Sequence, residues 1–172
     1  MAARLTMFLG GARSGKSRLA QAAAEAFPGP LTYLATGEAG DDEMAARIAR
    51  HRADRGPRWR TVECPVLLPE AIAGVGEGAV LVDCLTLWLS NLMGGGHDVA
   101  LGTGRLLHAL SATALPVVIV SNEVGLGIVP DYPLGRAFRD EAGRFNQAVA
   151  TRMDATYFVV AGRALRLERH DP

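Results

Sequence analysis

One short stretch, "GGARSGKS" at Gly10–Ser17, constrains the fold of this chain more than any other feature. It fits the pattern G-x-x-x-x-G-K-[ST], which wraps a phosphate when it connects a strand to a helix. The context also fits, because the apolar run Arg4–Gly11 precedes the loop and the alanine-rich run Lys16–Phe27 follows it. The stretch therefore predicts a strand, a phosphate loop and a helix, rather than a chance glycine-rich turn.

The residue types in this loop suit the phosphates of a nucleoside triphosphate. Glycines let backbone N–H groups approach phosphate oxygens at the start of a helix. Lys16 is the only lysine in the chain, and we predict that it reaches the β- and γ-phosphates while the Ser17 hydroxyl binds Mg²⁺. The predicted phosphate-binding residues are Gly10, Gly11, Ala12, Arg13, Ser14, Gly15, Lys16 and Ser17.

An acid at the end of a neighbouring strand would complete such a site. The apolar run "AVLVD" ends at Asp83, which would hold Mg²⁺ through water or activate an incoming hydroxyl. The alternative is that Asp83 caps the helix that follows, and the two roles are compatible. Mg²⁺ is thus the predicted cofactor, with Ser17 and Asp83 as its protein ligands.

Short apolar runs alternate with helical patterns along the rest of the chain. This alternation indicates an α/β fold with a mainly parallel sheet and helices on both faces. We expect a P-loop NTPase fold of the RecA-like type, forming one domain over residues 1–172. The segment Gly94–Gly104, "GGGHDVALGTG", is predicted to be a surface loop or a short linker. The other predicted strands are Leu31–Thr36, Arg58–Cys64, Gly78–Thr86, Leu115–Gly125, Ala155–Gly162 and a short edge strand from Arg163, and the other predicted helices are Gly40–Asp54, Leu87–Met93, Arg105–Thr113 and Pro133–Met153.

Charge and composition exclude some classes of partner. The formal net charge is zero, which does not favour broad attraction to nucleic acid or to a membrane surface. No run reaches the roughly 18 apolar residues that a membrane span needs. Cys64 and Cys84 match no metal-binding spacing, so we expect free thiols in a reducing, cytoplasmic compartment.

The segment Glu43–Arg60 gathers six arginines around a single histidine, His51. On a helix, Arg47 and Arg55 would lie one turn on either side of His51. Nearby positive charge disfavours the imidazolium form, so a neutral, nucleophilic imidazole that attacks phosphorus is one interpretation. A solvated basic helix with an incidental histidine is the other, and the residue types alone leave both open.

Five motifs in series give the chain a resemblance that covers nearly its whole length. They are "GGARSGKS", "YLATGEAGDDEMAARIARHRADRGPRWRTVE", "LVDCLTLWLSNL", "VSNEVGLGIVP" and "FRDEAGRFNQAVA". The chain resembles the bifunctional adenosylcobinamide kinase / adenosylcobinamide-phosphate guanylyltransferase family of cobalamin biosynthesis. The first motif is shared with many NTPases, whereas the other four are specific to the family. The segment around Gly94–Gly104 departs from it, being shorter and richer in glycine, which leaves contacts with the corrinoid unpredicted.

The resemblance implies two reactions, with GTP or ATP and adenosylcobinamide as substrates. A nucleoside triphosphate phosphorylates the aminopropanol hydroxyl of adenosylcobinamide, and GMP is then transferred from GTP to that phosphate through a guanylylated histidine. The histidine of the family's R-I-x-x-H pattern corresponds to His51. The family is also known as a homotrimer with the nucleotide near a subunit boundary.

The resemblance also extends the set of expected site residues. The Glu63 carboxylate could accept a hydrogen bond from guanine or ribose. The alternative is that Glu63 is a surface acid at the end of a strand, without a role in binding. Asn122 and Glu123 are expected to position substrate or metal, without an assigned step. Additional residues implied to bind nucleotide are Ala35, Thr36, Gly37, Arg52, Ala53, Asp54, Arg55, Glu63 and Asp83.

Two other functions remain compatible with the phosphate loop. The first is a small-molecule kinase that does not use a covalent histidine. The second is a nucleotide-dependent switch or assembly ATPase, although such proteins usually carry effector surfaces or further domains. Dependence of turnover on the corrinoid would discriminate among these possibilities.

Overall fold

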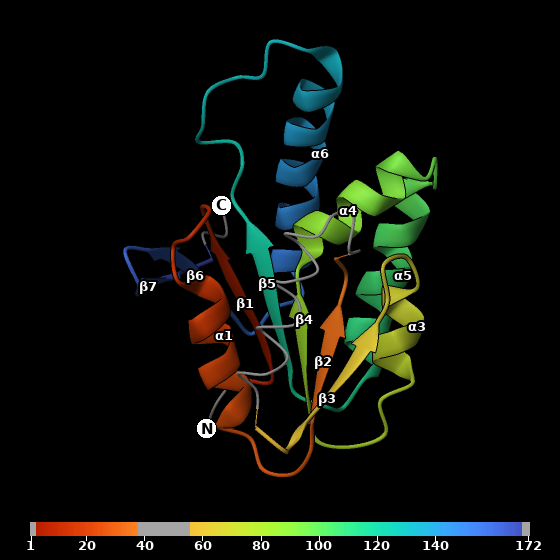
Figure 1. Cartoon of the computed structure of the whole chain (residues 1–172), viewed down its shortest axis with the longest axis vertical. Coiled ribbons are helices and arrows are strands. Elements are labelled where there is room, and N and C mark those ends of the chain that lie inside the picture. The colour runs from red at the N-terminus through yellow and green to blue at the C-terminus, as the bar shows by residue number, and fades with distance from the viewer. Residues whose placement is uncertain (1–2, 38–55, 170–172) are drawn as a thin grey trace.

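The computed structural model describes residues 3–37 and 56–169. In these residues seven strands form one sheet in the order β3-β2-β4-β5-β1-β6-β7 (Figure 1). Strands β1 to β6 pair in parallel, and β7 pairs with β6 in the antiparallel direction, so the predicted mainly parallel sheet is confirmed. The strands are β1 (Leu5–Gly10), β2 (Leu31–Ala35), β3 (Trp59–Glu63), β4 (Ala79–Asp83), β5 (Val117–Asn122), β6 (Ala155–Val160) and β7 (Arg163–Leu167), and the helices are α1 (Lys16–Glu25), α3 (Leu68–Ala73), α4 (Leu85–Gly94), α5 (Val99–Ala112) and α6 (Pro133–Ala150).

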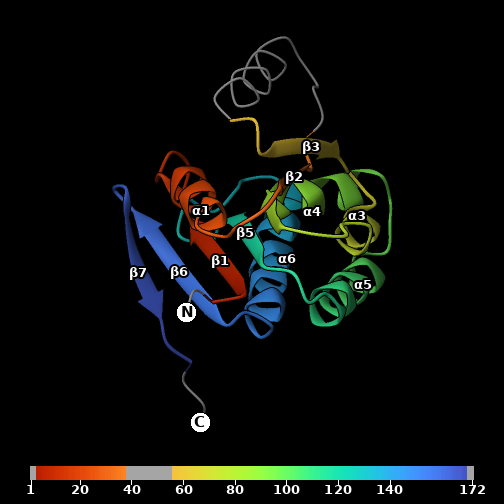
Figure 2. The ribbon, with the colours of Figure 1, turned by 90° about the horizontal axis from the view of Figure 1, so that it is seen from below.

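Helices cover both faces of the sheet, as the continuous apolar strands predict (Figure 2). On β1, Met7 lies in a core shared with α3, α4, α5 and α6, whereas its neighbour Phe8 lies in a second core against α1. On β4, Val82 lies in the first of these cores and its neighbour Leu81 lies in the second. Successive strand residues point to opposite faces, so burial on both faces requires apolar residues at every position.

The prediction of a surface loop over Gly94–Gly104 is wrong in its second half. Helix α5 begins at Val99, because the Asp98 side chain accepts a hydrogen bond at 2.9 Å from a backbone N–H of the first turn. Gly102 lies inside this helix, where a Cβ would be 3.0 Å from Leu92 Cδ1 of α4. Glycine at this position therefore allows two helices to pack closely, and does not mark a loop.

Two glycines of α5 are expected to respond in opposite directions to substitution. Gly102→Val should lower the free energy of unfolding by about 1–3 kcal/mol, because the new side chain would overlap Leu92. Gly104→Ala should raise it by roughly 0.5–1 kcal/mol, because its Cβ would meet nothing within 4 Å and alanine favours a helix. Urea unfolding followed by circular dichroism measures both changes. Equal effects of the two substitutions would contradict the packing described.

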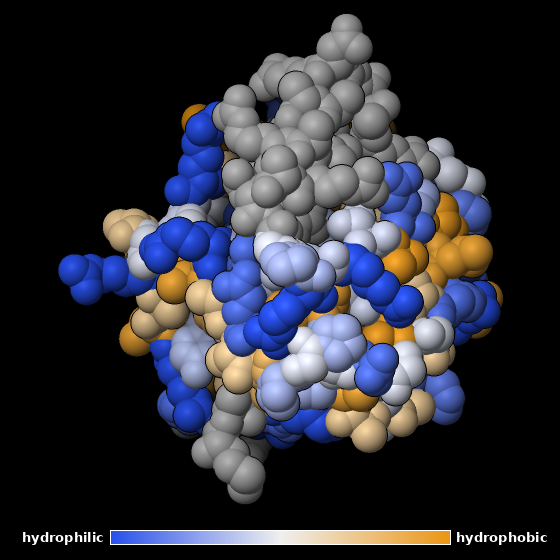
Figure 3. Space-filling model, turned by 60° about the horizontal axis from the view of Figure 1, so that its bottom comes forward, coloured by the Kyte–Doolittle hydropathy of each residue, from blue (hydrophilic) through white to orange (hydrophobic). Residues whose placement is uncertain are grey.

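The surface combines a largely hydrophilic face with local apolar exposure. Figure 3 shows one side of the molecule, where hydrophilic side chains predominate and apolar residues form separate patches. Among the described residues, the large apolar side chains with the greatest exposure are Ile128 at 98% and Leu126 at 81%. Both belong to the loop between β5 and α6. Within the described ranges, no helix has the length and apolar character that crossing a membrane requires.

Candidate nucleotide-binding site

Site residues predicted on several strands meet at one edge of the sheet, where the parallel strands end. In the strand register, Glu63 of β3 lies beside Ala35 of β2, and Ala35 lies beside Asp83 of β4. Gly10, the last residue of β1, pairs with Asn122, the last residue of β5. Strand β5 lies between β1 and β4, so the phosphate loop and Asp83 flank its carboxyl end (Figure 1). Ligands of open α/β sheets bind at such an edge.

Backbone geometry makes glycine necessary at two positions of the phosphate loop. Gly15 precedes α1 with φ +97°, in the left-handed region that favours glycine. A Cβ on Gly10 would lie 2.4 Å from the carbonyl oxygen of Val159 on β6. Glycine at these positions lets the loop adopt the tight turn in which backbone N–H groups can surround a phosphate.

The turn between β6 and β7 supports this loop from the neighbouring side. The Gly162 backbone N–H donates a hydrogen bond to the Ser14 carbonyl oxygen at 2.8 Å. The Cα of Gly162 lies 3.1 Å from the position that a Cβ on Gly15 would occupy. Sequence reasoning missed this contact, because the two segments lie near opposite ends of the chain and no local pattern links them.

Lys16 begins α1 and is buried, with 8% of its surface exposed. Its Nζ donates a hydrogen bond to the Gly11 carbonyl oxygen at 2.9 Å, which directs the side chain back over the loop. Burial raises the pKa of the Cys84 thiol, the Asp83 carboxylate raises it further, and the Lys16 ammonium opposes the rise. Lys16 begins α1 directly after the loop that follows β1, and Asp83 ends β4, with only β5 between these two strands in the sheet.

The two cysteines should be unreactive in the folded protein. Both are free and buried, and burial raises the pKa of Cys64 to about 11 and also raises that of Cys84. At pH 8 a chromogenic disulfide reagent should react with neither thiol within minutes, and with both after unfolding in guanidinium chloride. The unfolded thiols ionise more readily, so the free energy of unfolding should also fall as the pH rises above about 9. Rapid labelling of the native protein would contradict this burial.

The turn after β2 is fixed to the end of β4 by a buried threonine. Thr36 is 0% exposed, and its hydroxyl donates to the Cys84 carbonyl oxygen at 2.7 Å and accepts from the Cys84 N–H at 2.8 Å. The Asn91 side chain of α4 donates to the Thr36 carbonyl oxygen at 2.7 Å. The predicted nucleotide-binding turn Ala35–Gly37 is therefore held beside Asp83. The role of Asn91 was not predicted, since a single amide on a helix gives no sequence signal.

The donors at this edge fit Mg²⁺ that is bound together with a nucleotide. Within residues 3–37 and 56–169, no group of three His, Cys, Asp or Glu side chains could hold a metal ion. Mg²⁺ in phosphoryl-transfer sites instead uses one or two protein oxygens and the phosphates of the substrate. Asp83 and Ser17 offer oxygen ligands of this kind. Ser17 lies in the first turn of α1, and Asp83 is the last residue of β4. The Ser14 hydroxyl is buried without a hydrogen-bond partner, and a bound phosphate could satisfy it.

The predicted nucleophile and its neighbours lie outside the described residues. These are His51 and the segment Arg52–Arg55. Two arginines of the same basic segment are described. Arg58 donates to backbone carbonyl oxygens at and after the end of α1, including that of Gly29 at 2.9 Å. Arg60 donates through Nε to a threonine hydroxyl of β2 at 3.1 Å, so both arginines make structural contacts.

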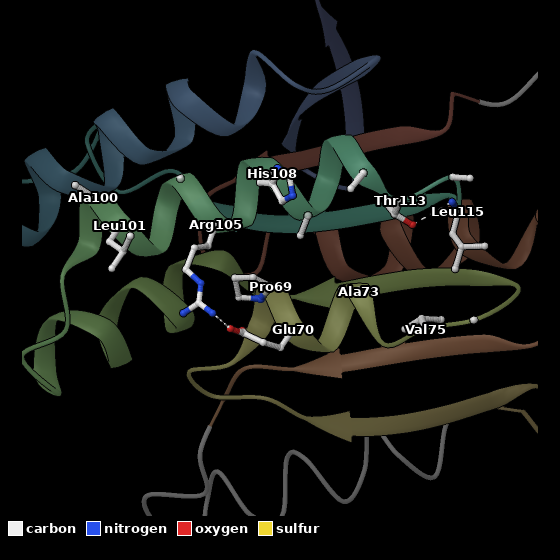
Figure 4. Close-up of a pocket in the computed structure, with 15 residues that line it drawn as sticks. Pro69, Glu70, Ala73, Val75, Ala100, Leu101, Arg105, His108, Thr113 and Leu115 are labelled. Atoms are coloured by element: carbon white, nitrogen blue, oxygen red, sulfur yellow. Dashed lines mark hydrogen bonds and ion pairs between the residues drawn. The ribbon is translucent and has the colours of Figure 1, made fainter.

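A groove of about 840 Å³ lies elsewhere, between α3 and α5 (Figure 4). Its lining is mainly apolar and includes His108 and the ion pair of Glu70 with Arg105. None of the predicted nucleotide-binding residues lines it. The groove is therefore separate from the site at the sheet edge.

The chain is similar in fold to a solved recombinase. A crystal structure of the RadB recombinase matches it with a TM-score of 0.53 and 15% sequence identity, covering 91% of this chain and 74% of that chain. At this identity the likeness concerns the fold alone. It agrees with the predicted α/β fold, a mainly parallel sheet with helices on both faces.

Sequence comparisons give a more specific relationship. The family model described as "Cobinamide kinase / cobinamide phosphate guanyltransferase" matches residues 6–167. The bifunctional adenosylcobalamin biosynthesis protein CobP of Pseudomonas aeruginosa is 45% identical over 166 residues, covering 94% of this chain and 96% of CobP. The corresponding protein CobU of Salmonella typhimurium is 39% identical over 181 residues, covering 95% and 99%. The chain therefore belongs to the cobinamide kinase / cobinamide phosphate guanyltransferase family.

Proposed function

We propose that this chain carries out both reactions of its family on adenosylcobinamide. The family consists of bifunctional enzymes of adenosylcobalamin biosynthesis, named for a kinase and a guanyltransferase activity. The observation that carries the proposal is the family match over residues 6–167, which includes the phosphate loop, His51 and Asp83. The grouping of the phosphate loop, Ala35, Glu63 and Asp83 at one edge of the sheet supports it.

In the first reaction, the aminopropanol hydroxyl of adenosylcobinamide attacks the γ-phosphorus of ATP or GTP. A new O–P bond forms as the bond between the γ-phosphorus and the bridging oxygen breaks, and the nucleoside diphosphate leaves. The hydroxyl proton passes to the Asp83 carboxylate. Lys16 and the backbone N–H groups of the loop bind the β- and γ-phosphates, which places the γ-phosphorus in line for attack.

In the second reaction, an imidazole nitrogen of His51 attacks the α-phosphorus of GTP. An N–P bond forms, the anhydride bond between the α- and β-phosphates breaks, and pyrophosphate leaves. An oxygen of adenosylcobinamide phosphate then attacks the same phosphorus and displaces the histidine. The products are adenosylcobinamide-GDP and free His51.

We assign nucleotide binding in both reactions to the residues predicted from the sequence. The arginines of Arg52–Arg55 suit the charge of the triphosphate and of the leaving pyrophosphate, because a guanidinium can bind phosphate oxygens in pairs. We propose that Glu63, the register partner of Ala35, accepts a hydrogen bond from guanine or ribose. Mg²⁺ held by Ser17, and by Asp83 through a water molecule, would neutralise negative charge on the phosphates and leave the Asp83 carboxylate able to accept the hydroxyl proton.

We further propose that the chain forms a homotrimer, as its resemblance implies, and that it acts in the cytoplasm. Two free, buried cysteines are compatible with a reducing compartment. Analytical ultracentrifugation at micromolar concentration would test the assembly, and a single monomeric species would refute it.

Turnover with the corrinoid tests the proposed function. Purified protein with adenosylcobinamide, Mg²⁺ and ATP should give adenosylcobinamide phosphate, and later addition of GTP should give adenosylcobinamide-GDP and pyrophosphate. Chromatography and mass spectrometry distinguish the products. Formation of the phosphate alone would indicate a kinase without guanylyl transfer. Nucleotide hydrolysis that ignores the corrinoid would favour a switch ATPase and refute both proposed reactions.

A further inference from the structure

Asn122 occupies the position between the phosphate loop and the Asp83 strand. It is the last residue of β5, and its register partner on β1 is Gly10. Its Nδ2 lies 3.9 Å from the Sγ of Cys84, the residue that follows Asp83 in the chain. We infer that the Asn122 side-chain amide contacts the phosphoryl group during transfer, which makes Asn122 a further catalytic residue of the kinase reaction. This inference rests on the proposed function and assigns a step to a residue of the same site.

A buried network fixes the backbone of Asn122 from two helices. Its N–H donates to Thr86 Oγ1 of α4 at 2.7 Å, and its carbonyl oxygen accepts from Asn146 Nδ2 of α6 at 3.1 Å. The Ser121 hydroxyl donates to Asn146 Oδ1 at 2.7 Å and lies 3.4 Å from Thr86 Oγ1. Burying polar side chains is costly unless they are hydrogen-bonded, and a satisfied network specifies a single arrangement. The three surrounding side chains therefore hold the end of β5 in one place.

The side chain of Asn122, in contrast, makes few hydrogen bonds to the described residues. In the described part of the chain its amide makes only the long contact with the Cys84 sulfur, and its Oδ1 has no hydrogen-bond partner there. The neighbouring Glu123 differs, because its carboxylate accepts from the Gly125 N–H and its own N–H donates to the Gly10 carbonyl oxygen at 3.1 Å. Glu123 therefore shapes the turn, whereas the described residues leave the Asn122 amide largely unengaged, as contact with a ligand requires.

A neutral amide suits a position beside a phosphoryl group in transfer. Its N–H can donate to a non-bridging oxygen of the γ-phosphoryl group without the repulsion that a carboxylate would cause. Charge on these oxygens is redistributed as the bond to the leaving diphosphate breaks, and a preorganised donor stabilises that state. Removing one such donor from an active site costs about 10²–10³ in kcat. Asn122 takes no proton and forms no covalent bond in this scheme.

Two substitutions of Asn122 test the inference in the full-length protein. Asn122→Ala removes the amide, and Asn122→Asp keeps its shape but replaces the donor with negative charge. Both should lower kcat for adenosylcobinamide phosphorylation by about 100-fold, with KM for ATP changed by less than about threefold, because the contact strengthens in the transition state. ATP affinity by calorimetry and thermal unfolding should stay close to wild type. Unchanged kcat in both variants would overturn the inference, as would a loss of kcat that is matched by a loss of ATP binding or of folding.

The buried network provides a second measurement. Asn146→Ala removes the hydrogen bond to the Asn122 carbonyl oxygen, and kcat should fall by roughly tenfold while KM for ATP is retained. Gln147→Ala is the matched control, because Gln147 is the next residue of α6 and is exposed. A lower melting temperature with unchanged kcat in Asn146→Ala would show a purely structural role and remove the network from the proposal.

Failure of the inference can be separated from failure of the proposed function. A wild-type protein that does not phosphorylate adenosylcobinamide would refute the proposed function. The variants would then be compared by the slow hydrolysis of ATP with Mg²⁺, in which the same γ-phosphoryl group is transferred to water. Equal hydrolysis by wild type and Asn122→Asp would overturn the assignment of Asn122 as well.

Discussion

Replacing His51 with alanine is expected to abolish GMP transfer and leave phosphorylation of adenosylcobinamide largely intact. The guanylyl step needs an atom that forms a bond to the α-phosphorus, and alanine supplies none. The kinase step transfers the γ-phosphoryl group directly to the substrate hydroxyl and has no such requirement. We expect the rate of adenosylcobinamide-GDP formation to fall by at least about 10³-fold. The kinase rate should change by less than about threefold, because Lys16 and Asp83 remain in place.

GTP labelled at the α-phosphorus measures the same step directly. Wild-type protein should retain label that is lost in acid and stable in base, as an N–P bond requires, and His51→Ala should retain none. His108→Ala is the matched control, because His108 is an exposed histidine of α5, outside the predicted nucleotide site. Full guanylyltransferase activity in His51→Ala would disprove the covalent mechanism, even if the protein otherwise behaves as a kinase.

The sequence was sufficient to predict the central sheet and which candidate residues meet where its parallel strands end. Strands β1, β4 and β5 lie between helices and are buried on both faces, so their apolar runs mark them within a few residues. The phosphate loop was predictable because its signals are local. The glycines of a tight turn, the start of a helix and a lysine all occur within the eight consecutive residues Gly10–Ser17. Asp83 was predictable once a parallel sheet was assumed, because the carboxyl ends of parallel strands share one edge.

Features that depend on packing between distant segments were not predictable. Helix α3 spans only Leu68–Ala73, too few residues for an apolar period to distinguish a helix from a loop. Gly102 looked like part of a loop because its contact with α4 is not visible in a local pattern. The Ser121–Asn146 hydrogen bond joins residues 25 positions apart, and each is an ordinary polar residue in its own segment. Such residues become informative only when the fold brings them together.

Replacing Lys16 with alanine should impair both reactions, which distinguishes it from every other substitution considered for this site. Lys16 is buried at the start of α1, and its Nζ bonds to the Gly11 carbonyl oxygen, so its charge is held over the phosphate loop. A fixed ammonium there stabilises the β- and γ-phosphates in the kinase step. It also stabilises the leaving pyrophosphate of guanylyl transfer. We expect kcat/KM for each reaction to fall by at least about 10²-fold.

Arg18→Ala is the matched control for this effect, because Arg18 is a cation of the same helix that is exposed and contacts Gly162 at 3.4 Å. Its loss should change either rate by no more than about threefold, as expected for a screened surface charge. Lys16→Arg should not restore activity, because the larger planar guanidinium does not fit a buried site shaped around a compact ammonium. Steady-state rates of both reactions, with ATP affinity by calorimetry, measure these differences. Loss of only one activity in Lys16→Ala would show that the two reactions bind their triphosphates at separate sites, and would refute a shared phosphate loop.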